Sequence, residues 1–112
     1  MPVRLNTVGL GNLINGRDVV PELAQVIDAV SVSVNTADPA EWIKLHRPRP
    51  AYRAGGFAAV LSFVSGCVAA HLRTRVTAVE RPGADLDAVA ALARRLGAGF
   101  LARPALDEAE AA

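Results

Sequence analysis

The first residues of chemical interest alternate with valines in one short stretch. Across residues 30–35 the polar side chains of Ser31, Ser33 and Asn35 follow one valine each. Alternation with period two is typical of a β-strand, so the three polar side chains share one face of that strand. Buried hydroxyl and amide groups need hydrogen-bond partners. This face therefore meets either a ligand or other polar groups and water in a barrel interior.

Polar residues also stand at the carboxyl ends of the other expected strands. Ligands of α/β folds gather at the carboxyl ends of parallel strands. The residues at these ends form a set that we call the rim: Asn6, Thr7, Ser33, Asn35, Glu80 and Arg103. A rim of this composition suits a small polar ligand. Strands also end in polar residues near solvent, and both explanations stand at this point.

Other residues of chemically useful types lack partners at a suitable spacing. His46 and His71 are far apart and have no further ligand nearby in the sequence, so we expect no metal site. Cys67 lies within an apolar helical pattern, which favours a core residue over a nucleophile. Glu80 or Asp85 could act as an acid or base in an unrelated α/β enzyme, but no second carboxylate or histidine is placed beside either. We assign no catalytic residue.

Composition excludes several classes of protein. The 112 residues are 52% hydrophobic and 21% charged, which suits a single globular domain. The net charge of +1 gives no electrostatic footprint for nucleic acid. No apolar run approaches the roughly 20 residues of a membrane span, and one cysteine forms no intramolecular disulfide. We expect a cytoplasmic chain that binds neither nucleic acid nor membranes.

Strands and helices alternate along the sequence. We expect strands at residues 3–8, 29–34, 74–80 and 99–103. We expect helices at residues 18–28, 39–47 and 56–72, and a fourth that Asp85 caps and Gly97 ends. Residues 38–41 (DPAE) predict a helix start, with Asp38 as the N-cap, Pro39 at the first position and Glu41 completing a capping box. We expect no helix directly after the glycine-rich turn at residues 9–12. This order predicts parallel strands joined by right-handed crossovers.

Two segments together resemble a known family. Residues 4–9 (RLNTVG) resemble the "TNG" strand end of radical S-adenosylmethionine (radical SAM) enzymes, with Val8 in place of the usual Asn. Residues 30–35, with the helix start at 38–41, resemble the strand and helix that follow in this family, with Asn35 in place of Asp. The loops at 11–18 and 79–85 are most similar to the radical SAM proteins associated with TatD-family nucleases. The resemblance covers the chain to about Arg103.

The resemblance implies a fold and a cofactor. The fold is the parallel-stranded half of a partial TIM-type (βα)6 barrel, with about four strands and four helices. Residues 1–104 would be the C-terminal half of the barrel, and residues 105–112 a flexible acidic tail. Full-length members hold a 4Fe–4S cluster and S-adenosylmethionine. By this resemblance Thr7 and Ser33 lie near the methionine or ribose part of the cofactor, while Asn35, Glu80 and Arg103 lie around its tail or the substrate.

The chain departs from the family where the iron chemistry takes place. The CxxxCxxC loop is absent from these 112 residues, and Cys67 alone does not replace its three thiolates. We therefore expect no activity from the chain alone. A separately encoded N-terminal half, or self-association through the open edge of the sheet, would complete it. The alternative is a non-catalytic binding or scaffold module that uses the rim.

Overall fold

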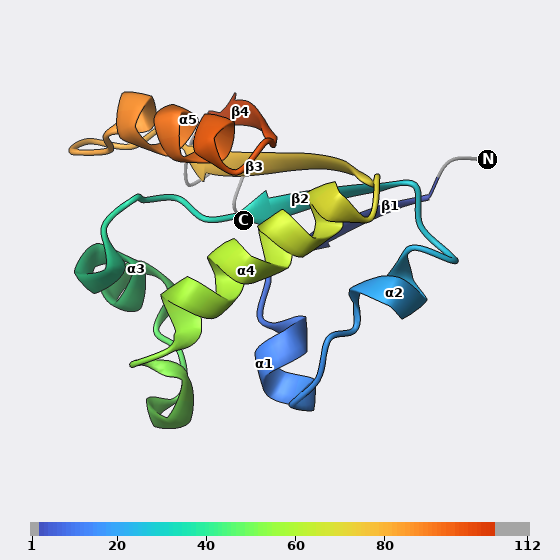
Figure 1. Cartoon of the computed structure of the whole chain (residues 1–112). Helices are drawn as coiled ribbons and strands as arrows, with labels where there is room; N and C mark the ends of the chain where they lie inside the picture. The colour runs from blue at the N-terminus through green and yellow to red at the C-terminus, as the bar shows by residue number, and fades with distance from the viewer. Residues whose placement is uncertain (1–2, 105–112) are drawn as a thin grey trace, which may run out of the picture.

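The computed structural model describes residues 3–104. Its elements follow in the order β1 (Arg4–Thr7), α1 (Gly11–Asn15), α2 (Val20–Leu23), β2 (Ala29–Ser33), α3 (Pro39–His46), the 3₁₀ helix η1 (Pro50–Tyr52), α4 (Gly56–Ala69), β3 (Arg73–Val79), α5 (Leu86–Arg95) and β4 (Gly99–Arg103) (Figure 1). The predicted acidic tail at residues 105–112 lies outside the described residues. Among residues 3–104, no helix is long and apolar enough to cross a bilayer.

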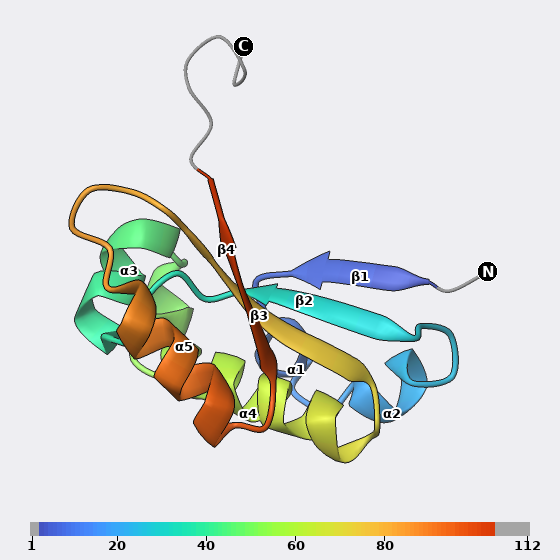
Figure 2. The ribbon, with the colours of Figure 1, turned by 90° about the horizontal axis from the view of Figure 1, so that it is seen from above.

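The four strands form one parallel sheet in the order β1-β2-β3-β4. Each strand therefore pairs with the strand before it, and β1 and β4 are the edges. Helices α4 and α5 contact the strands, while α1, α2 and α3 contact α4. All of them lie on one side of the sheet (Figure 2). The predicted α/β class and parallel pairing are confirmed, and the sheet is an open one.

The side of the sheet that meets the helices is apolar. Strands β2 and β3 supply four side chains there with no exposed surface: Val30, Val32, Val76 and Ala78. The facing helices α4 and α5 supply buried partners: Val60, Phe63, Val64, Cys67, Val89 and Ala93. We call this side the covered face and the opposite side the open face. Because alternate residues of a strand point to opposite faces, the valines of β2 fix which residues reach the open face.

The segment between β1 and β2 differs from the prediction. The expected helix at residues 18–28 is reduced to α2, four residues long. Side chains decide where it begins, because Asn12 Oδ1 accepts the amide of Val19 at 2.8 Å and Asp18 Oδ1 accepts that of Val20 at 3.0 Å. The expectation of no helix directly after the glycine-rich turn is also wrong, since α1 begins at Gly11.

Helix α3 packs against α4 through Trp42. The indole is fully buried and stacks on His46, with ring centroids 5.3 Å apart. It lies so close to the start of α4 that a Cβ on Gly56 would sit 2.5 Å from Trp42 Cη2. Its neighbours show that Trp42 joins the two helices.

Candidate functional site

The open face carries the polar side chains of the sheet. Strand register places Asn6, Ser31 and Arg75 in one row, and Ser33 and Thr77 in the next row toward the carboxyl ends. Within residues 3–104, no helix covers this face (Figure 2). Ser31 and Thr77 are nevertheless 3% and 2% exposed. Hydroxyls at this depth require partners, and the structure supplies them.

An open cleft of about 510 Å³ lies at the carboxyl ends of β2, β3 and β4. Its lining consists of Ser33, Thr77, Val79, Arg103 and Pro104. The hydroxyl of Thr77 donates to Ser33 Oγ at 3.3 Å. Ser33 accepts this bond and keeps its own proton free to donate. Two predicted rim residues, Ser33 and Arg103, thus line one cleft. It contains the hydroxyls of Ser33 and Thr77 and the guanidinium of Arg103.

Thr7 lies on the other side of the sheet. Its Cα is in register with that of Val32, so its side chain belongs to the covered face. The hydroxyl accepts the amide of Gly9 at 3.1 Å and shapes the turn after β1. Gly9 has φ +86°, and a Cβ there would come within 3.0 Å of Val32 Cγ1. The structure therefore does not bring Thr7 together with Ser33.

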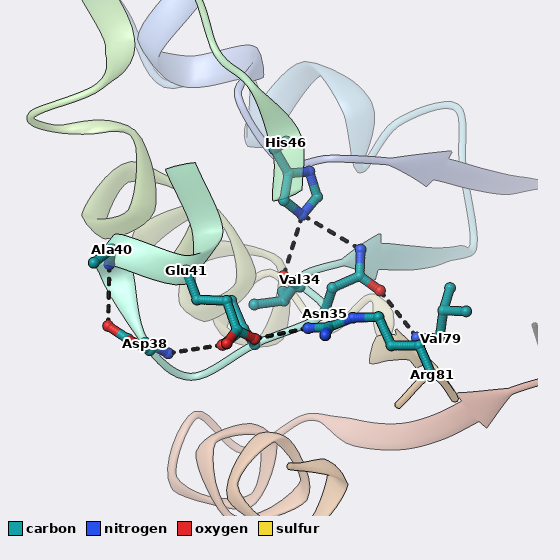
Figure 3. Close-up of polar contacts among 9 residues, drawn as sticks. Val34, Asn35, Asp38, Ala40, Glu41, His46, Val79 and Arg81 are labelled. Carbon is teal, nitrogen blue, oxygen red and sulfur yellow. Dashed lines mark hydrogen bonds and ion pairs between the residues drawn. The ribbon is translucent and has the colours of Figure 1, made fainter. Parts of the chain in front are cut away.

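At the end of β2, the side chain of Asn35 accepts a hydrogen bond that a backbone carbonyl would accept within the sheet. It adopts a left-handed conformation, with φ +68°, and its Oδ1 accepts the amide of Val79 at 2.9 Å. Its Nδ2 lies 3.3 Å from His46 Nε2, which itself lies 3.2 Å from the carbonyl oxygen of Val34 (Figure 3). Asn35 therefore extends the pairing of β2 with β3 by one hydrogen bond, beside the cleft rather than within its lining.

The imidazole of His46 makes one of two bonds according to its tautomer. With a proton on Nε2 it donates to the carbonyl of Val34, and without that proton it accepts from the Asn35 amide. Burial lowers the pKa of His46, and the Val34 carbonyl offsets part of this effect. Desolvation disfavours the charged form, so the folded chain favours a neutral imidazole.

An ion pair connects α3 to the loop after β3. Arg81 Nη2 donates to Glu41 Oε1 at 2.7 Å (Figure 3). Hydrogen bonds from Arg81 first, and from Thr36 second, hold the pKa of Glu41 below its ordinary value.

The predicted capping box is half right. Asp38 caps α3 by accepting the amide of Ala40, but its own amide donates to Thr36 and not to Glu41.

The two carboxylates considered as acids or bases are placed apart from the cleft lining. Asp85 Oδ1 accepts the amide of Ala88 at 3.0 Å and caps α5, which confirms its predicted capping role. The backbone amide of Glu80 donates to the carbonyl of Arg103 at 2.7 Å and prolongs the pairing of β3 with β4. The side chain of Glu80 is exposed.

The residues present do not fit an iron–sulfur cluster. Cys67, the single cysteine of the sequence, is buried in the core on α4. Burial, and to a lesser degree the charge of Asp18, raise the pKa of its thiol to about 11. Among residues 3–104, no group of three His, Cys, Asp or Glu side chains is placed to hold a metal ion. Three thiolates are required for such a cluster.

The sequence analysis did not single out three residues that bond to the serines of the open face: Arg4, Arg75 and Thr77. On β3, Arg75 and Thr77 alternate with Val76 and Ala78, which is the same period-two pattern that singled out β2. That signal places both residues on one face of β3, and the strand register sets them beside Ser31 and Ser33. No family model, no curated protein and no solved structure matches this chain.

Proposed function

We propose that the chain forms one wall of a partial (βα)6 barrel of the radical SAM type and binds S-adenosylmethionine on its open face. The resemblance of residues 4–9 and 30–41 suggests the family. The strand order supports it, because neighbouring strands of a βα barrel follow one another in the chain and all helices lie outside. In this proposal the open face is the lumen of the barrel.

The polar cleft at the carboxyl ends of the strands carries the proposal. A ribose diol and an amino-acid head group require short neutral donors and acceptors together with a cation for the carboxylate. Ser33 and Thr77 supply the hydroxyls, and Arg103 supplies the guanidinium. The Ser33 proton is free to donate because its oxygen already accepts from Thr77. Parallel α/β folds use this end of the sheet for ligands.

Thr7 and Asn35 have supporting roles in this proposal. The Thr7 hydroxyl fixes the turn that follows β1. The Asn35 amide holds the backbone of Val79, which is part of the cleft lining. Both residues thus shape the ends of the strands on which a ligand would rest. Neither hydrogen bond needs the cofactor.

The chain alone is proposed to bind the cofactor and not to generate a radical. A 4Fe–4S cluster would supply the electron for such chemistry, and the described residues do not provide its ligands. Polypeptide beyond the 112 residues, such as a separately encoded half barrel, would have to supply them. The exposed edge strands β1 and β4 offer unpaired backbone groups for such a partner.

Titration with S-adenosylmethionine, followed by amide chemical shifts, tests the binding function. We expect weak, saturable shifts confined to the cleft lining, with a dissociation constant in the millimolar range. Ser33→Ala should weaken binding by about 3- to 10-fold, the worth of one neutral hydrogen bond. Ser62→Ala, an exposed serine on α4, is the matched control and should change nothing. Unchanged affinity in Ser33→Ala, or no saturable shifts, would contradict the proposal.

The second candidate is a non-catalytic binding or scaffold module that uses the same rim. The absence of a cluster site among residues 3–104 favours it. Unpaired edge strands predict self-association. The molar mass, measured by light scattering across a wide concentration range, tests whether it occurs. A chain that stays monomeric throughout, and binds S-adenosylmethionine no better than adenosine, would favour this second candidate.

A further inference from the structure

Two arginines of the open face converge on one serine. Arg4 Nη1 lies 3.0 Å from Ser31 Oγ, and Arg75 Nε lies 2.7 Å from the same oxygen. The arginines come from β1 and β3, on either side of the strand that carries Ser31. Because both guanidinium groups donate to a single atom, two positive charges are held close together in the middle of the face.

Within the described part of the chain, no ion pair compensates the charge of these two arginines. A neutral hydroxyl accepts hydrogen bonds but does not cancel repulsion between like charges. The ion pairs within residues 3–104 are Arg17–Glu22 and Glu41–Arg81, which involve neither arginine. Within the same range, the strand positions that face this side include four arginines and no carboxylate: Arg4, Asn6, Ala29, Ser31, Ser33, Arg73, Arg75, Thr77, Val79, Gly99, Leu101 and Arg103.

Hydrogen bonds to Ser31 hold both arginines, of which Arg4 is exposed and Arg75 is half-buried. Ser31 itself is 3% exposed. Gly99, which is in register with Arg75, adds no side chain of its own beside it. Ser31 accepts two bonds and keeps its own proton for a third partner. The site therefore offers two guanidinium groups and a hydroxyl donor on the open face.

We propose that Arg4, Ser31 and Arg75 bind the phosphate group of a small phosphorylated molecule. A phosphate monoester carries nearly two negative charges at neutral pH, which match the two guanidinium groups. Its oxygens accept bidentate bonds from arginine, and one more accepts from the hydroxyl. The site lies one row away from the cleft of Ser33 and Thr77 and uses none of the residues that line the cleft. The inference does not depend on S-adenosylmethionine binding.

Titration with inorganic phosphate at constant ionic strength, with chloride as the replacement anion, tests the site. The Nε–H signal of Arg75 is expected to shift and saturate. Arg75→Gln and Arg4→Gln should each weaken phosphate binding by about tenfold or more, because each removes a charge-assisted bond. Arg75→Lys keeps the charge and should lose less, which keeps the test valid if Arg75→Gln folds poorly.

The controls separate this site from general attraction of anions. Arg53→Gln removes an equal charge from an exposed position after η1 and should leave phosphate affinity unchanged. The sequence also carries carboxylates at Asp107, Glu108 and Glu110, and their change to amides should have little effect. A gain of more than about tenfold in that variant would identify them as competing counter-ions and overturn the proposal. Equal losses in Arg53→Gln and Arg75→Gln, or tighter binding of succinate than of phosphate, would also overturn it.

Discussion

The covered face and the open face come from the same strands but differ in what fills them. On β2, Val30 and Val32 have no exposed surface and pack against α4 and its neighbours. Between them and beyond them, Ser31 and Ser33 point the other way and bond to arginine and threonine. A few residues of one strand therefore supply both apolar burial and a row of hydrogen-bonding groups.

The difference shows which face accounts for stability and which is free for a ligand. Burial of apolar side chains contributes about 25 cal/mol for each Å² removed from water, so the covered face supplies most of the folding free energy. Exchanging a hydrogen bond with water for one within the protein contributes far less. Side chains of the open face can therefore be changed with small cost to folding. Variants on the two faces test this division.

Removal of the Trp42 side chain should cause the largest loss in the free energy of unfolding. Trp42→Ala leaves a large cavity between α3 and α4 and should lower the free energy of unfolding by about 3–5 kcal/mol, measured by chemical denaturation. Trp42→Phe should cost far less, because it also removes a buried indole Nε1 that has no hydrogen-bond partner among residues 3–104. A loss below about 1 kcal/mol in Trp42→Ala would mean that the helix layer contributes little to stability.

Adjacent residues of β2 give the most direct comparison of the two faces. Val32→Ala should lower the free energy of unfolding by about 2 kcal/mol, since it removes fully buried methyl groups. Ser33→Ala removes one hydrogen bond at the cleft and should cost less than about 1 kcal/mol. Denaturant unfolding of both variants provides the measurement. Equal costs would contradict the division between the faces.

Asn35 tests how the end of β2 is held. Asn35→Ala loses the bond to Val79 and places an ordinary side chain at φ +68°, so we expect a loss of about 1–3 kcal/mol in the free energy of unfolding. Asn35→Gly loses the same bond but tolerates this backbone conformation, so its loss should be smaller. Thermal unfolding of the two variants separates the two contributions. A larger loss in the glycine variant would show that backbone conformation is not limiting.

The smallest expected effect is a pH dependence from His46. Its pKa is lowered in the folded chain, so the unfolded chain binds more protons in acid. Stability is full above the ordinary histidine value of 6.5 and falls as pH drops through the lower folded pKa. His46→Gln should remove this part of the profile, while His71→Gln, at an exposed position, should retain it. Denaturation at a series of pH values provides the test, and an unchanged profile in His46→Gln would contradict the assignment.

Local patterns were enough to predict the strands and the helix caps. Alternation fixed the faces of β2, and Asp38 and Asp85 cap the predicted helices because an N-cap depends only on the next few residues. The helix expected at residues 18–28 failed for a different reason. Side chains of Asn12 and Asp18 bind amides at the start of α2, and this local chemistry outweighs apolar periodicity.

The candidate site was predicted only in part because it depends on strand register. The rule that ligands bind at the carboxyl ends of parallel strands correctly predicted that Ser33 and Arg103 lie near each other, and both line one cleft. It did not say that Thr7 pairs with Val32 and so faces the helices. Whether a residue of one strand shares a face with a residue of another is fixed by pairing across strands, and a shift of one residue reverses every face.

Because the backbone amide of Val79 donates to Asn35 Oδ1, its hydrogen exchange can report whether the cleft is occupied. Val79 is part of the cleft lining, and its N–H is held by a side chain instead of by a neighbouring strand. Amide hydrogen exchange at this position therefore follows the opening of one side-chain contact, which needs less free energy than opening of the sheet. A ligand that fills the cleft would slow exchange at Val79 while leaving the amides of the covered core unchanged. Occupancy can thus be followed at a single backbone position without any label.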